Sequence, residues 1–213
     1  MEESRLGHIA FIDDAHTFGG AQIALLRAIK ALSENVACKI TVITANRNLF
    51  LEELKTLREV AVICCPPSYP INILVFPLSL RKASRILNEE RLRNVDYWIV
   101  NLPGIEFGLA YLILLRNRSN KVIGWLHNAE RLLSLMPHAA GFRRWMYSIR
   151  DMAADRFLFH IYHCLIVPSF AAKDVVLQRT LAISNIQVVF NFLERRENFN
   201  GNISNNNLVH ERR

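Results

Sequence analysis

The chain has 213 residues, of which 51% are hydrophobic and 21% are charged. This composition supports a buried core and excludes a wholly disordered chain, and the length fits one large domain or a domain with a tail. The formal net charge of +7 is concentrated in residues 116–150, which carry seven basic side chains and one acidic side chain. The local excess indicates an anionic partner: a phospholipid surface, a phosphorylated ligand or nucleic acid.

Taken in chain order, apolar runs rich in β-branched residues alternate with segments of helical periodicity. The predicted strands are residues 8–12, 39–44, 60–64, 97–100, 121–126, 164–167 and 186–189. The predicted helices are residues 21–32, 49–58, 80–92, 105–115, 141–160 and 171–179. Strands that each lead into a helix predict a Rossmann-like α/β domain, with a parallel sheet of about seven strands and helices on both faces. We expect this domain to cover residues 1–191, and residues 192–213, rich in Asn, Glu and Arg, to form a polar linker or disordered tail.

The sequence gives little support for a membrane span, for secretion or for a bound metal. The first residues show no apolar segment of the secretory type, and the longest apolar run, 107–115, is too short to cross a bilayer. The adjacent Cys64 and Cys65 should point to opposite faces of a strand and share no metal. His160 and His163 are spaced to ligate a metal, but no third ligand accompanies them. We therefore expect a cytoplasmic chain with reduced cysteines and no bound metal.

Because ligands of parallel sheets bind at the carboxyl ends of the strands, the loops after each strand hold the candidate site residues. Gly19 and Gly20 lie where the first strand turns into the first helix. Their amides and the helix dipole suit an anion, such as a diphosphate, although a plain glycine turn is the alternative. The glycines do not form the GxGxxG pattern of dinucleotide-binding proteins, and no acidic residue ends the second strand. Arg47 alone leaves a phosphorylated nucleotide, and hence an oxidoreductase, open.

Several polar residues at other strand ends have both a structural and a functional interpretation. Asp13 or Asp14 could act as a base on an acceptor hydroxyl, or could cap a helix; only one of them can face the site. His127 ends an apolar strand and is either a structural hydrogen-bonding residue or part of the active site. Asn101 is interpreted first as part of a turn and second as an acceptor contact.

The segment HIAFIDDAHTFGGAQIALLRAIKAL, residues 8–32, resembles the opening of retaining GT-B glycosyltransferases of the group 1, family four type. The likeness continues in KVIGWLHN (121–128), CLIVPSFAAKDVVLQ (164–178) and IQVVFNFLE (186–194). Two departures from the family pattern are Gln22, where many members have Glu, and Phe192, where Gly is usual. Four segments in the family's order form a more specific pattern than any one of them.

The resemblance implies roles for individual residues. Gly19 and Gly20 would line the cleft beneath the diphosphate of the donor and the acceptor, and His127 would face the transferred sugar as a hydrogen-bond donor. By the same resemblance Ser169 would start the helix after its strand, and Asn191 would lie at the exit to the second domain. We expect both, together with Asp14 and Asn128, to bind substrate.

The resemblance also implies that a second domain, which holds the nucleoside-diphosphate sugar, is missing after Asn191. We therefore expect an acceptor-side domain that is inactive alone, binds no cofactor itself, and works with a C-terminal GT-B domain in cis or as a separate chain. The full enzyme would transfer a sugar to a saccharide or lipid-linked acceptor in polysaccharide or lipopolysaccharide biosynthesis. No metal is needed for retention in this fold.

The predicted helix 141–160 places aromatic and apolar side chains beside Arg143, Arg144 and Arg150, with Trp145 among them. This pattern suits an anionic membrane surface, and so a peripheral location on the inner face of the membrane, or else a helix packed on the sheet. No nucleic-acid-binding motif is present, and we expect no such partner. The alternative to an enzyme domain is a non-catalytic Rossmann-like binding or membrane-docking module.

Overall fold

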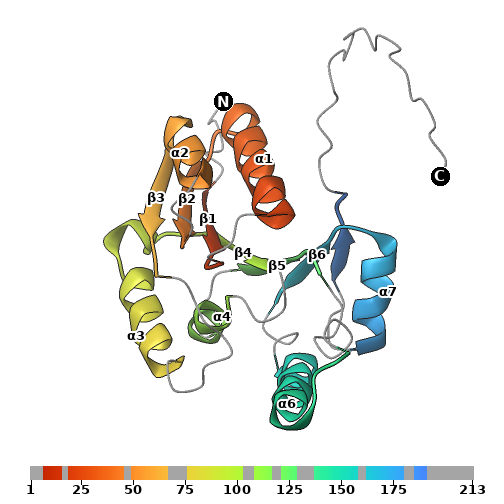
Figure 1. The fold of residues 1–213 in the computed structure, drawn as a ribbon. Helices are drawn as coiled ribbons and strands as arrows, with labels where there is room; N and C mark the ends of the chain where they lie inside the picture. The colour runs from red at the N-terminus through yellow and green to blue at the C-terminus, as the bar shows by residue number, and fades with distance from the viewer. Residues whose placement is uncertain are drawn as a thin grey trace, which may run out of the picture.

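The computed structural model describes residues 7–15, 19–45, 49–66, 76–102, 108–116, 121–128, 137–157, 162–179 and 185–190. Seven strands in these residues form one parallel sheet in the order β3-β2-β1-β4-β5-β6-β7 (Figure 1). The strands are β1 His8–Asp13, β2 Lys39–Thr44, β3 Val60–Cys64, β4 Tyr97–Leu102, β5 Lys121–Leu126, β6 Cys164–Val167 and β7 Ile186–Val188. The predicted Rossmann-like parallel sheet is therefore confirmed, with all seven strands within two residues of their predicted bounds.

The helices agree less closely with the sequence prediction. They are α1 Gly20–Asn35, α2 Leu49–Thr56, α3 Phe76–Leu87, α4 Leu109–Leu115, α6 Gly141–Phe157 and α7 Phe170–Arg179, with a short 3-10 helix at Glu90–Leu92. Helix α3 begins four residues earlier than predicted, because Pro77 is tolerated in a first turn, where its missing N–H would have no partner. The expected start of α4 at residues 105–108 and the tail after residue 190 lie largely outside the described residues.

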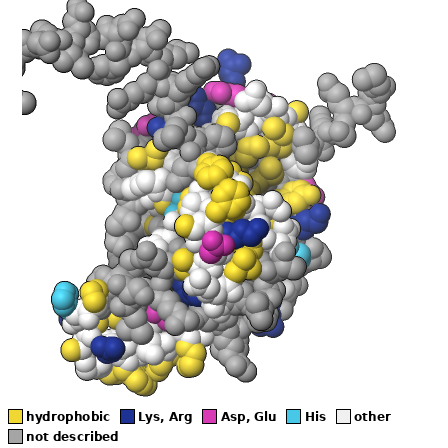
Figure 2. Space-filling view, turned by 90° about the vertical axis from the view of Figure 1, so that its right-hand side faces the viewer, with side chains coloured by type: hydrophobic (Ala, Val, Ile, Leu, Met, Phe, Trp, Pro, Cys, Tyr) yellow, Lys and Arg dark blue, Asp and Glu magenta, His cyan; other side chains and the backbone are white. Residues whose placement is uncertain are grey.

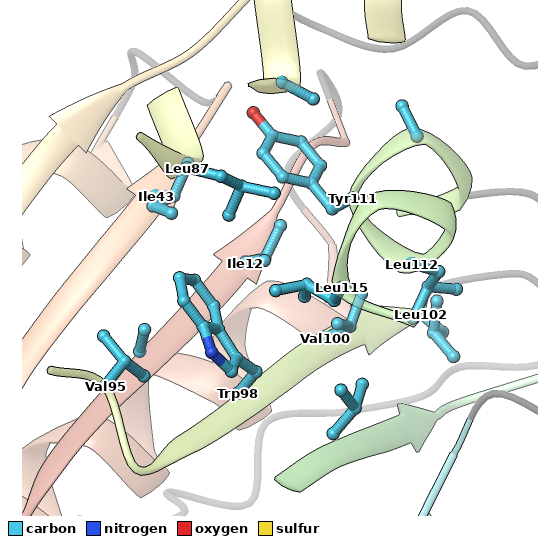
Figure 3. Packing of buried hydrophobic residues seen from close by; sticks show 14 of the residues in the cluster. Ile12, Ile43, Leu87, Val95, Trp98, Val100, Leu102, Tyr111, Leu112 and Leu115 are labelled. Atoms are coloured by element: carbon cyan, nitrogen blue, oxygen red, sulfur yellow. The ribbon is translucent and has the colours of Figure 1, made fainter. Parts of the chain in front are cut away.

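The alternation of side chains along each strand creates a separate core on each face of the sheet. On one face Phe11 and Trp125 pack with buried residues of α1 and α2, such as Leu25 and Phe50. The opposite core lies beneath α3, α4 and α7, and Figure 3 shows part of it. Its members include Ile12, Trp98, Val100, Tyr111, Leu112 and Leu115. Among the described residues, α6 contributes to neither core, and Figure 1 shows it below the sheet.

The strand order decides where a ligand site can form. The chain runs from β1 outward through β2 to β3 and then returns to place β4 on the other side of β1. At such a reversal the connections leave β1 and β4 in opposite directions, and ligands of open α/β sheets bind beside this point at the carboxyl ends of the strands. The residues to inspect are those that end β1, β4 and the neighbouring β5.

Candidate functional site at the carboxyl ends of β1, β4 and β5

Three polar side chains from three adjacent strands meet at this edge. Asn101, near the end of β4, donates from Nδ2 to Oδ1 of Asp13, the last residue of β1, at 2.9 Å. The Oδ1 atom of Asn101 lies 2.8 Å from Nε2 of His127, which directly follows β5. The backbone N–H of His127 also donates to the carbonyl of Leu102 at 3.0 Å, which continues the β4–β5 pairing past the end of the strand. The chain of contacts from Asp13 through Asn101 to His127 therefore follows from the strand order.

Helix α1 adds a fourth polar group to this cluster. Nε2 of Gln22 donates to Oδ1 of Asp13 at 3.1 Å, and the Gln22 side-chain oxygen accepts from the backbone N–H of Gly19, also at 3.1 Å. The second contact is half of a capping box at the start of α1. A Glu at position 22 would bring a second carboxylate against the buried Asp13. Gln22 is therefore matched to its surroundings in this chain.

Burial controls the charge of both ionisable groups in the cluster. Asp13 is completely buried, and this burial raises its pKa to about 7, against the opposing hydrogen bonds from Asn101 and Gln22. Its second oxygen, Oδ2, has no hydrogen-bond partner among the described residues. Burial lowers the pKa of His127 to about 4, and its ring stacks on Trp125 with centroids 5.2 Å apart. His127 is therefore neutral at physiological pH.

The two adjacent carboxylates have different roles. Asp14 lies on the opposite side of the sheet from Asp13, and both of its oxygens accept from the backbone N–H of Gly108, at 2.9 and 3.0 Å. Gly108 precedes α4 and has φ of +74°, so it needs the freedom of glycine. Asp14 thus holds the start of α4, the helix-capping alternative that the sequence left open. The implied substrate-binding role of Asp14 stays a prediction.

Nothing in the described part of the chain requires glycine at positions 19 and 20, at the start of α1. Gly19 has an extended backbone with φ of −155°, which any residue can adopt. A Cβ added at Gly20 would meet no atom within 4 Å, and one added at Gly19 would meet only Oε1 of Gln22, at 3.8 Å. Neither backbone strain nor internal packing among the described residues explains these glycines. Space for something outside the protein remains as an explanation.

The other predicted site residues are spread over several positions. Ser169 precedes α7, and its hydroxyl accepts from the backbone N–H of Ala172 at 3.1 Å, as expected of a helix cap. Asn128 follows His127 and is half-buried, whereas Asn191 lies outside the described residues. His163 has a structural contact, since its Nδ1 accepts from the backbone N–H of Val122 at 3.1 Å. His160, the other histidine of the possible metal pair, also lies outside the described residues.

Helix α6 carries a surface of exposed apolar side chains. Phe142 is 70% exposed, Trp145 58% and Met152 63%, and the rings of Phe142 and Trp145 stack with centroids 5.5 Å apart. Arg143 and Arg144 are exposed beside them, and the side chain of Arg150 lies outside the described residues. Figure 2 shows α6 as the lobe at the lower left, with hydrophobic and basic side chains on its surface. The exposure of Phe142 and Trp145 favours the first of the two alternatives for this helix, contact with a surface outside the domain, which stays a prediction.

Comparison with solved structures defines the class of fold. HepE of Anabaena, solved with UDP and glucose, shares 16% identity and a TM-score of 0.58 over 87% of this chain and 44% of its own. UGT2 of Phytolacca americana, solved with UDP-2-fluoro-glucose and pterostilbene, shares 11% identity and a TM-score of 0.60 over 89% of this chain and 54% of its own. The lipopolysaccharide outer core galactosyltransferase WaaB shares 15% identity and a TM-score of 0.52 over 86% of this chain and 45% of its own. The fold is that of one half of the GT-B glycosyltransferases, and the chain spans about half the length of these neighbours.

The family follows from the sequence. The model of Glycosyltransferase Family 4 matches residues 18–196, so the chain belongs to this family. The predicted resemblance is thereby confirmed. A search among curated proteins found no match.

The sequence indicates His127 as a site residue but does not predict its connection to Asp13 and Asn101. It favours a turn at Asn101, whereas this residue is completely buried and lies in β4. The sequence does contain a signal for this cluster, since Asp13, Asn101 and His127 each stand at the end of an apolar strand. Only the strand order shows that these three ends are adjacent.

Proposed function

We propose that this chain is the acceptor-side domain of a retaining glycosyltransferase, which moves a sugar from a nucleoside-diphosphate donor to a saccharide or lipid-linked acceptor. The observation that carries the proposal is the position of His127 in a family four domain. Hydrogen bonds through Asn101, Asp13 and Gln22 connect it to the start of α1 at Gly19, beside the switch point of the sheet. HepE and UGT2 are described with UDP or a UDP-sugar, which supports a nucleotide-sugar donor for this chain's enzyme.

In this proposal each part of the site has a physical task. Gly19 and Gly20 leave room for the acceptor and the edge of the diphosphate, and the first-turn amides of α1 face developing negative charge there. His127 contacts the transferred sugar as a neutral ring. Asn128, Ser169 and Asn191 are the further substrate contacts that the family likeness suggests. The donor nucleotide is bound by a second GT-B domain, in cis or as a separate chain, so residues 1–191 alone do not catalyse transfer.

The test is substitution of His127 in an enzyme that includes the second domain. His127→Ala should lower kcat at least about a hundredfold, while the unfolding transition of the domain stays cooperative. His163→Ala is the matched control, since His163 is exposed and its described contact is with the backbone of Val122. Near-normal turnover in His127→Ala would remove the assignment.

The exposed apolar surface of α6 supports a second part of the proposal, contact with an anionic membrane. Among the described residues no helix has the length and apolar character needed to cross a bilayer. Aromatic side chains flanked by Arg143 and Arg144 suit the boundary between headgroups and acyl chains. We place the enzyme peripherally on the cytoplasmic face, where a lipid-linked acceptor would be presented.

Vesicle flotation distinguishes this specific contact from non-specific adsorption to lipid. The chain should bind vesicles that contain phosphatidylserine and not neutral phosphatidylcholine vesicles, and the substitution of Phe142 and Trp145 by Ser should abolish binding. Phe170→Ser is the control, because Phe170 is 64% exposed and belongs to another helix, α7. Vesicle binding by a chain that has no role in sugar transfer would favour the alternative, a non-catalytic docking module.

A further inference from the structure

The hydrogen bonds behind His127 determine which of its two ring nitrogens carries the proton. An ionised carboxylate only accepts hydrogen bonds, so the group that faces Oδ1 of Asp13 from Asn101, at 2.9 Å, must be the amide NH₂. The amide oxygen of Asn101 therefore faces His127. Since this oxygen only accepts, Nε2 of His127, 2.8 Å away, must be the protonated nitrogen.

Gln22 fixes the same arrangement from the other side of Asp13. Its side-chain oxygen accepts from the backbone N–H of Gly19, so its NH₂ group points toward Oδ1 of Asp13. Oδ1 thus receives two amide donors, and Oδ2 is left as the place for a proton when Asp13 is neutral. Oδ1 is then a carbonyl oxygen and still accepts. The orientation of both amides, and the proton on Nε2 of His127, hold in either protonation state of Asp13.

The described surroundings of His127 also keep the ring uncharged, because burial removes the ring from water. Asp13 is the carboxylate nearest to it in the chain of contacts, and the amide of Asn101 separates the two. Asp14 points to the opposite face of the sheet, toward Gly108, and Gln22 on α1 carries no charge. The ring stacks on Trp125, which contributes to its burial. A neutral ring with its Nε2 proton donated to Asn101 keeps a lone pair on Nδ1, which has no hydrogen-bond partner among the described residues.

We infer that Asn101 is a positioning residue that holds His127 as the neutral Nε2–H tautomer, so that Nδ1 accepts a hydrogen bond from a hydroxyl group of the substrate. The inference rests on the proposed function for the identity of the substrate, a sugar, but not for the tautomer. It reverses the donor role that the sequence suggested for His127, because the proton of the neutral ring is already donated to the protein. A site of this kind selects a hydroxyl and discriminates against a group that can only accept, such as fluorine.

The tautomer can be measured on this chain directly by two-bond ¹H–¹⁵N correlation spectra of the histidine rings over a pH titration. We expect a protonated Nε2 and an unprotonated Nδ1 in His127, with no titration between pH 8 and about pH 5. A protonated Nδ1 in the neutral ring, or a titration midpoint near the ordinary value of about 6.5, would overturn the inference.

Asn101→Asp is the discriminating variant. In this variant Asp13 and the new carboxyl would share one proton. The remaining negative charge would pair with the imidazolium and raise the titration midpoint of His127 by more than about one pH unit. Asn185→Asp, an equal change at an exposed residue before β7, should leave the midpoint unchanged. Equal midpoints in Asn101→Asp and the wild type would contradict the positioning role. If Asn101→Asp does not fold, the tautomer measured in the wild type still confirms or overturns the inference.

The tests distinguish a failure of this inference from a failure of the proposed function. Sugar transfer that depends on His127, combined with a protonated Nδ1, would refute the inference and leave the function intact. The expected tautomer combined with full activity of His127→Ala would refute the function and, with it, the hydroxyl contact.

Discussion

Substitution of Gly20 by Ala tests whether this glycine leaves room for a ligand or only forms part of a turn. Gly20 is the first residue of α1, it is exposed, and an added Cβ would meet no protein atom within 4 Å. Alanine is favoured over glycine in helices, by up to about 1 kcal/mol in the interior and less in the first turn. Gly20→Ala should therefore leave the free energy of unfolding unchanged or raise it by about 0.5 kcal/mol.

The same methyl group should be costly for catalysis if a substrate lies against α1. Overpacking a close contact costs about 1–3 kcal/mol, which corresponds to a loss in kcat/KM of between about fivefold and about 160-fold. The two assays are urea unfolding of the domain and initial-rate kinetics of the enzyme that includes the second domain. Unchanged kinetics together with the gain in stability would show that nothing approaches Gly20, and would refute the reasoning.

Gly124→Ala is the matched control for this experiment. At Gly124, in β5, an added Cβ would lie 2.6 Å from Cε1 of Tyr162 and 2.8 Å from Cδ1 of Leu165. This substitution should lower the free energy of unfolding by about 1–3 kcal/mol. The two glycines thus predict opposite changes in stability, and equal effects would show that the packing argument is wrong.

Three further predictions test other parts of the structure. The carboxyl of Asp13 has its pKa raised to about 7 in the folded protein, whereas in the unfolded chain it ionises near pH 4. The wild type should therefore lose stability relative to Asp13→Asn as the pH rises from 4 to 7, by at most about 4 kcal/mol. Urea midpoints of the two proteins that run parallel over this range would contradict this prediction. Gly108→Ala should destabilise the domain by more than about 1 kcal/mol in thermal unfolding, because φ is +74° and the new Cβ would collide with Val100; a wild-type melting temperature is the contrary result. Substitution of both Phe142 and Trp145 by Ser should leave the urea midpoint within about 0.5 kcal/mol of the wild type, because both side chains are exposed; a large loss of stability would mean that the helix packs on the protein.

The sequence alone determined the elements and the class of fold. Each strand is a short apolar run bounded by turn residues, and a buried parallel strand needs little more than such a run. The repeated order of strand and helix leaves few topologies other than a doubly covered parallel sheet. The family likeness located His127 and the two glycines for the same reason, since these residues follow strands directly.

Only the tertiary structure decided how the polar residues combine. Asp13 and Asn101 are 88 positions apart along the chain, and they meet because β4 pairs with β1 on the side away from β2. The separation of Asp13 from Asp14 depends on which helices cover each face of the sheet. The tautomer of His127 depends further on the orientation of the side-chain amides of Asn101 and Gln22, which is fixed by hydrogen bonds between different strands and helices. No local pattern encodes these contacts, because each involves groups that folding brings together from distant parts of the sequence.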